Sequence, residues 1–219
     1  MFSKFQCLSG STLKLIAILL MLIDHIGVVL FPDCILLRII GRSAFPIFCF
    51  LLVEGFLHTR NKWHYAIRLA LFAILSQIPF SLVVHNTPFC FSYLNVFFTL
   101  LIGFLVLIGI EKVDGQNLPS ILIFILGCII SVVLNTDYSA IGIATILIFF
   151  TYAKSQKFLT LTLLLLFINS LGGNIQLFAI LSLIPIALYN HQRGLKLKYV
   201  FYIFYPLHLL ILYLISLYL

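Results

Sequence analysis

The feature that most constrains this chain is a series of apolar runs, several of them long enough for a helix to cross a membrane. In the first run, residues 13–31, only Lys14, Asp24 and His25 ionise. Overall, 63% of residues are apolar and 9% are charged, whereas a soluble domain carries roughly a quarter charged residues. Because about 20 apolar residues span the hydrocarbon layer as a helix, we expect an all-α membrane protein.

Short polar breaks separate about nine apolar segments (eight to ten). We expect them to form one polytopic transmembrane helix bundle, a single integral-membrane domain covering residues 1–219. The sixth and seventh segments are short for a full span, which suggests re-entrant or strongly tilted helices. The segments lie near residues 13–31, 35–57, 66–84, 94–110, 118–134, 139–153, 158–171, 174–190 and 199–218.

The basic residues predict how these segments are oriented. Cytoplasmic loops of membrane proteins are enriched in Lys and Arg, so the predicted orientation has the N-terminus in the cytoplasm and the C-terminus outside. The opposite loops then hold only Arg38 and Arg42. The net charge of +7 follows mostly from topology, and no nucleic-acid partner is expected. The residues assigned to cytoplasmic ends are Lys4, Arg60, Lys62, Lys112, Lys154, Lys157, Arg193, Lys196 and Lys198.

Asp24 is an acidic residue at membrane depth, where a charge costs about 2.5–3.5 kcal/mol on insertion scales. Arg38 and Arg42 enter the second segment from the same outer side and, at i and i+4, share a helical face. Pairing of Asp24 with Arg42 or Arg38 lowers the cost of both charges. Pro46 removes a backbone hydrogen bond and predicts a kink just past Arg42.

His25 and His208 are the two histidines expected inside the membrane. Asp24 and His25 point about 100° apart around a helix, so one can face the arginines while the other faces a different surface. A histidine near neutral pH can accept or donate a proton. His208, beside Pro206 in the last segment, is either a hydrogen-bonded packing residue or a second functional histidine at a similar depth, and the sequence leaves both open.

Other polar residues lie near the segment ends. Glu54 and His58, one turn apart, either bind phosphate or anchor a helix at the lipid headgroups. Asn95 and Thr99 form a polar pair at i and i+4, typical of helix packing. Asp137 and Tyr138 lie in a predicted external loop, where Asp137 is in a position typical of a helix N-cap.

These residues alone indicate either an enzyme or a proton-coupled transporter, because both use buried acidic, basic and imidazole groups. No inverted repeat is evident, and such a repeat would favour the transporter. No nucleophile elbow, phosphate-cradling glycine loop or metal-ligand spacing occurs, so no metal is expected. A third reading is a non-catalytic assembly factor for a membrane peptide.

The order of the motifs adds a family resemblance. LKLIAILLMLIDHIG, LRIIGRSAFPIFCFLLVEGFLHTRN, RLALFAILSQIPFSL and NVFFTLLIG, followed by NTDYSAIG, LYNHQRG and FYIFYPLHLL, resemble the TraX family in that order. The resemblance extends from about Leu13 to Leu212. Gln77 stands where that family's pattern suggests an acidic residue, which puts a catalytic role for position 77 in doubt.

The TraX resemblance implies a multi-pass acetyltransferase of the bacterial cytoplasmic (inner) membrane. Its expected partners are acetyl-CoA as co-substrate, a peptide or small-amine acceptor such as the N-terminus of a pilin-like or secreted peptide, and membrane lipid. The expected catalytic residues are His25 as base, Asp24 and Arg42 as its support, and His208 as alternative base or oxyanion donor. A direct transfer is simpler than an acyl-enzyme. The expected substrate-side residues are Arg38, Asn95, Asp137 and Tyr138.

The negative charges of acetyl-CoA require basic residues on the cytoplasmic side. One candidate site is the loop around residues 58–68, with the expected cofactor-binding residues Glu54, His58, Arg60, Lys62 and Arg68. The other candidate site is formed by Arg193, Lys196 and Lys198. The rival function is a proton-coupled transporter in which Asp24, His25 and His208 form a relay.

Overall fold

The computed structural model describes residues 6–114, 116–195 and 198–219, apart from the side chain of Lys198. Lys4 and Lys196 lie outside the described residues. Over these ranges the chain is helical, with two isolated bridges and no strand, so the all-α prediction is confirmed. Each predicted segment coincides with a helix or a pair of consecutive helices, with ends that differ by a few residues.

Four helical stretches of the described chain are long and apolar enough to cross a membrane, as expected of a membrane protein. They are residues 10–29, 35–58, 62–85 and 199–216. The predicted segment at 174–190 is not one α-helix: a nine-residue 3₁₀ helix leads into a five-residue α-helix. Long 3₁₀ helices are uncommon because their hydrogen bonds have poorer geometry.

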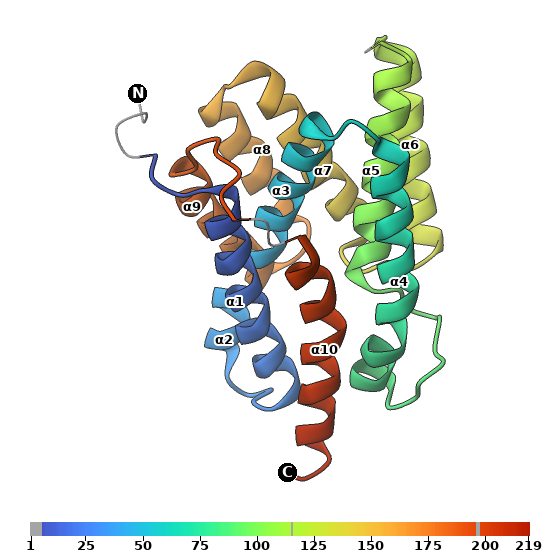
Figure 1. The fold of residues 1–219 in the computed structure, drawn as a ribbon, viewed down its shortest axis with the longest axis vertical. Helices are drawn as coiled ribbons and strands as arrows, with labels where there is room; N and C mark the ends of the chain where they lie inside the picture. The colour runs from blue at the N-terminus through green and yellow to red at the C-terminus, as the bar shows by residue number, and fades with distance from the viewer. Residues whose placement is uncertain (1–5, 115, 196–197) are drawn as a thin grey trace. The chain divides into compact units, whose positions relative to one another are not determined.

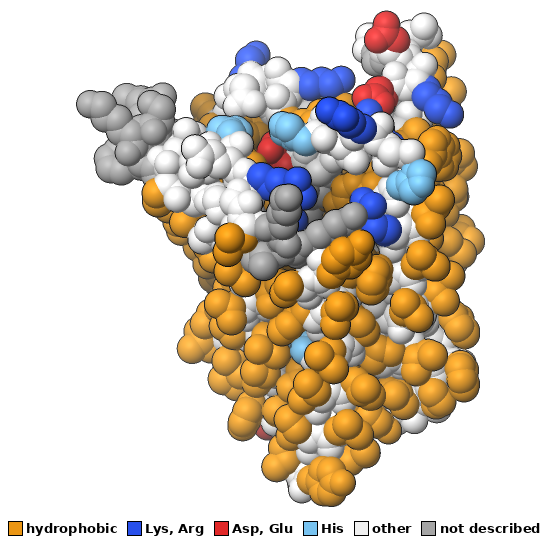
Figure 2. All heavy atoms as spheres, viewed as in Figure 1, with side chains coloured by type: hydrophobic (Ala, Val, Ile, Leu, Met, Phe, Trp, Pro, Cys, Tyr) orange, Lys and Arg blue, Asp and Glu red, His pale blue; other side chains and the backbone are white. Residues whose placement is uncertain are grey.

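The helices form two compact units, which we describe separately. The first unit comprises residues up to Leu51 and from Thr162 onward. In it α1 packs against both α2 and α10 (Figure 1), and the outward surface of α10 is covered by hydrophobic side chains (Figure 2). Its elements are α1 (Gly10–Val29), α2 (Ile35–Gly41), the start of α3 (Ala44–His58), most of α8 (Phe158–Ser170), η2 (Asn174–Ser182), α9 (Leu183–Ala187) and α10 (Lys198–Ser216).

The second unit, Leu52–Leu161, contains four complete helices: α4 (Lys62–His85), α5 (Val96–Lys112), α6 (Asn117–Val133) and α7 (Ser139–Ser155). Helix α5 packs against the other three and buries Phe97, Phe104 and Leu107 completely. Small residues allow close packing, since a Cβ at Gly127 would collide with Val106. Close approach at small residues is the usual way in which helices associate in lipid.

Candidate active site in the first unit

Asp24 forms the centre of an ion-pair cluster between α1 and α2. Arg38 Nη1 donates to Asp24 Oδ2 at 3.2 Å, and Arg42 Nη2 donates to the same oxygen. Asp24 is only 7% exposed, so the two guanidinium groups compensate a buried negative charge. The predicted pairing is confirmed, and it involves both arginines at once.

Gly41 makes this approach possible. It faces Asp24 directly: a Cβ built on Gly41 would overlap the Cβ of Asp24 and lie 2.6 Å from Oδ1. Gly27 on the opposite helix plays a similar part, because a Cβ there would lie 2.8 Å from the Cβ of Leu37. The two glycines bring the α1 and α2 backbones close enough for the ion pairs to form.

We therefore expect Gly41→Ala to displace Asp24 from the arginines and to lower thermal stability strongly, because backbone and Cβ atoms of Asp24 must move. The measurement is the melting temperature of the detergent-purified protein. The matched control is Gly109→Ala in α5, where the new methyl group meets the flexible Ile123 side chain at 3.0 Å. Equal melting temperatures for the two variants would contradict this role of Gly41.

The second membrane-length stretch is broken beside the cluster. Helix α2 ends at Gly41 and α3 starts at Ala44, so Arg42 and Ser43 form the break. Pro46, in the first turn of α3, has no N–H to donate to the carbonyl of Arg42, and prolines are tolerated in a first turn. The kink predicted just past Arg42 is therefore confirmed as a short break at residues 42–43.

His25 and His208 contact each other. His25 Nδ1 lies 2.7 Å from His208 Nε2, and His208 Nδ1 lies 2.7 Å from the backbone oxygen of Phe204. His208 is 4% exposed, whereas His25 is only half-buried. Asp24 thus faces α2 while its neighbour His25 faces α10, as the 100° offset predicts. The sequence left this meeting open, and the structure establishes it.

The predicted cofactor-binding residues belong to the second unit. Lys62 Nζ lies 2.5 Å from one carboxylate oxygen of Glu111 and also contacts the other. His58 Nδ1 donates to the backbone oxygen of Glu54 at 2.8 Å. Lys62 therefore has a carboxylate partner already, and the Glu54–His58 contact fits helix anchoring.

The two arginines of that set have different surroundings. Arg60 is exposed, and Arg68 is half-buried with its guanidinium carbon 5.3 Å from the ring centre of Tyr65. Neither has a carboxylate within ion-pair distance among the described residues. They remain candidates for binding an anionic group.

The predicted substrate-side residues other than Arg38 also lie in the second unit. Asn95 is fully buried, caps α5 and bonds with Gln77 and the backbone oxygen of Ala73. This geometry fits a structural role, and its substrate role remains a prediction. Asn95 and Thr99 have separate partners, since Thr99 donates to the backbone oxygen of Asp137.

The expectation that Asp137 caps a helix is wrong. Tyr138 occupies the N-cap position of α7, with a φ of 61° and no side-chain cap. The Asp137 carboxylate instead accepts a hydrogen bond of 2.9 Å from the hydroxyl of Tyr93. The competing phenol draws the carboxylate toward the loop before α5. A sequence pattern for capping contains no information on such a distant donor.

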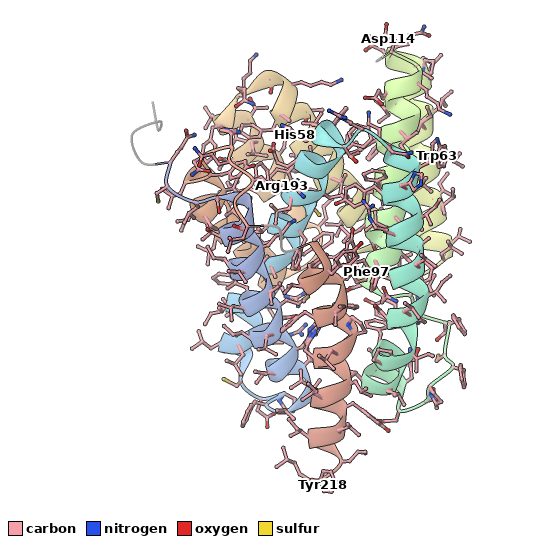
Figure 3. All side chains as sticks on the ribbon, in the orientation of Figure 1. His58, Trp63, Phe97, Asp114, Arg193 and Tyr218 are labelled. Carbon is pink, nitrogen blue, oxygen red and sulfur yellow. The ribbon has the colours of Figure 1, made fainter. Side chains whose placement is uncertain are left out.

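Lys14 is a basic residue of α1 to which the sequence assigned no role in the site. It precedes His25 by 11 residues, or about three helical turns, so both lie on one face of α1 about 16 Å apart. Lys14 is half-buried, and Arg193 lies close enough to repel it electrostatically. The Arg193 segment packs on the start of α1 (Figure 3), with its backbone oxygen 3.3 Å from a Cβ at Gly10. The 11-residue spacing between Lys14 and His25 was the sequence signal that could have placed the two residues on one helical face.

A comparison with protein families matches residues 9–216 to the family described as TraX protein. The chain belongs to the TraX family. A probable fimbrial assembly protein FimC, serogroup H1, of Dichelobacter nodosus is 30% identical to it, over 96% of this chain and 94% of the relative. An uncharacterized protein of Rickettsia prowazekii is 55% identical over 38 residues, 17% of this chain and 15% of that protein. No solved structure matches this TraX family member significantly.

Proposed function

We propose that this TraX family member is an integral-membrane acetyltransferase of the bacterial cytoplasmic membrane. It moves an acetyl group from acetyl-CoA to an amine acceptor. The observation that carries the proposal is the contact between half-buried His25 and buried His208 inside a unit of apolar helices. Titratable groups placed together at membrane depth are costly and usually functional.

The proposed chemistry is a direct acyl transfer. His25 takes a proton from the acceptor nitrogen as that nitrogen bonds to the thioester carbonyl carbon. The carbon–sulfur bond then breaks, and His25 returns the proton to the departing thiolate. The amine gains the acetyl group, CoA leaves as the thiol, and no further reactant is needed.

The positive charges of the first unit support binding of acetyl-CoA along α1. Lys14 and Arg193 supply two positive charges near the start of the helix, suited to phosphate oxygens. The distance of about 16 Å from Lys14 to His25 along one helical face is one that an extended pantetheine arm covers. With the N-terminus in the cytoplasm, these cations face the compartment that contains acetyl-CoA. Arg60 and Arg68 are the other candidates for the same role.

The acceptor is proposed from the relative. A name that describes a fimbrial assembly protein favours a pilin-like subunit, and the TraX resemblance implies its N-terminal amine. The amine is presented from the outer half of the membrane, where Asp24, His25 and the arginines lie in the proposed topology.

The test uses the purified protein in lipid nanodiscs with radiolabelled acetyl-CoA. The acceptor probes are an apolar synthetic peptide with a free N-terminus and the same peptide with a blocked N-terminus. Transfer of label to the peptide with the free N-terminus, and not to the blocked peptide, supports the proposal. Absence of both label and acetyl-CoA binding would contradict it and favour the proton-coupled transporter, in which the same histidines form a relay.

Lys14→Ala is expected to raise the KM for acetyl-CoA by about tenfold, the loss of one charge-assisted contact, with kcat little changed. The reason is that Lys14 lies about three turns from the proposed base and contacts only the nucleotide end of the donor. Lys154→Ala, which removes an exposed lysine of α7 in the second unit, is the matched control. An unchanged KM in Lys14→Ala would move donor binding to Arg60 and Arg68.

A further inference from the structure

The two histidines belong to a hydrogen-bond chain whose direction can be derived. His208 Nδ1 lies 2.7 Å from the backbone oxygen of Phe204, and a carbonyl oxygen can only accept, so Nδ1 carries a hydrogen. A neutral imidazole has one N–H, which makes Nε2 of His208 an acceptor. His25 Nδ1, 2.7 Å away, must then donate. His25 Nε2 is left as the bare, basic nitrogen.

His208 fits the neutral form that this derivation requires. The residue is 4% exposed, and its ring stacks on that of Phe204 at 4.7 Å and 15°. Tyr205 lies edge-on to it at 5.7 Å. No carboxylate among the described residues pairs with it. An isolated charge in such surroundings is strongly disfavoured, and the two aromatic rings hold the imidazole in one orientation.

We propose that His208 is a positioning residue, which fixes His25 in the Nδ1–H tautomer and shares the proton that His25 takes up. In the resting state the hydrogen of His25 Nδ1 points at His208 Nε2. When His25 Nε2 takes a proton from the acceptor, the Nδ1 hydrogen can shift toward His208 and spread the positive charge over both rings. The proton returns along the same bond when the thiolate leaves.

This assignment separates roles that the sequence left open. His208 uses both nitrogens, one toward Phe204 and one toward His25, so neither its lone pair nor its N–H is available to a substrate. His208 therefore suits neither the role of the base nor the role of the oxyanion donor. The roles in acetyl transfer rest on the proposed function, whereas the tautomer of the pair does not.

The first test is ¹⁵N NMR of histidine-labelled protein in nanodiscs, with His25→Asn and His208→Asn used to assign the signals. We expect both histidines as the Nδ1–H tautomer, the form that free imidazole disfavours. An Nε2–H on His208 would overturn the proposal. This outcome is readable even if the protein transfers no acetyl group, so it can fail separately from the proposed function.

The second test compares two substitutions at position 208. Gln can place an acceptor oxygen near the position of Nε2, whereas Asn reaches only the position of Nδ1 and leaves the His25 N–H without a partner. We expect His208→Asn to lower kcat/KM for acetyl transfer by about 10²-fold, the size of effect seen when a group that orients a catalytic histidine is lost. His208→Gln should stay within about tenfold of the native enzyme.

The pH profile distinguishes this role from simple packing. Among the described residues, the charged and titratable groups around His25 are Asp24 on its own helix, Arg38 on α2, Arg42 just after α2, and Tyr205 and His208 on α10. An amide oxygen cannot take a share of the proton, so protonated His25 is less stabilised in His208→Gln. The acid limb of kcat/KM should therefore move to lower pH. If the acid limb does not move, and kcat/KM falls equally in His208→Gln and His208→Asn, the proposal is overturned and His208 is only a packing residue.

Discussion

His25→Ala is expected to lower kcat/KM for acetyl transfer by about 10³-fold, within the range for loss of a general base. The physical reason is that the acceptor nitrogen must lose a proton as it bonds to the thioester carbon, and no other half-buried imidazole lies at this depth in the first unit among the described residues. The measurement is the initial rate of label transfer at saturating and at limiting acetyl-CoA.

The control for that loss is His85→Ala, which removes a half-buried histidine from the last turn of α4. It should keep native rates. A His25→Ala protein that folds, binds acetyl-CoA and transfers label at the native rate would rule out His25 as the base. A loss shared by both variants would point to a general effect of removing histidines.

Asp24→Leu is expected to produce the largest loss of stability. It leaves Arg38 and Arg42 without the carboxylate oxygen that both contact, and removing one partner of a buried pair costs about 3–5 kcal/mol. The measurement is thermal unfolding followed by the fluorescence of Trp63, the single tryptophan of the chain. Asp24→Asn, which retains a hydrogen-bond acceptor, should fall between Asp24→Leu and the native protein.

A triple variant tests the physical origin of this loss. When all three charges are replaced by leucine, no uncompensated charge remains, and buried ion pairs exchanged for apolar groups are often neutral in stability or better. The triple variant should therefore melt near the native temperature and yet lack activity. If the triple variant is as unstable as Asp24→Leu, the cost lies in packing around Gly41 and not in charge.

The sequence predicts the helical segments well because the hydropathy of a segment indicates whether it lies in lipid or in water. It also predicts the ion-pair cluster, since Asp24, Arg38 and Arg42 are near neighbours in the chain with few alternative partners. The break at residues 42–43 follows from Pro46, a local effect of a missing N–H. These features depend on short-range rules.

What the sequence does not predict depends on distant packing. His25 and His208 are 183 residues apart, and their contact requires α10 to lie beside α1. The carboxylate of Asp137 is drawn to Tyr93, 44 residues away, instead of capping its own helix. Gln77, where an acidic residue was expected, donates to the backbone oxygens of Cys90 and Tyr93. An amide can donate in this way and a carboxylate cannot.

The positions of the site residues along the chain set an order for its assembly. Asp24 and both arginines come from the first 42 residues, so their charges can be compensated as soon as the hairpin of α1 and α2 enters the membrane. His208 lies 183 residues after His25 in the chain, and helix α10 must dock on α1 before the histidine pair exists. A nascent chain can therefore insert with these charges compensated while the histidine pair is still absent, and the proposed chemistry becomes available only after α10 has been made and has docked on α1.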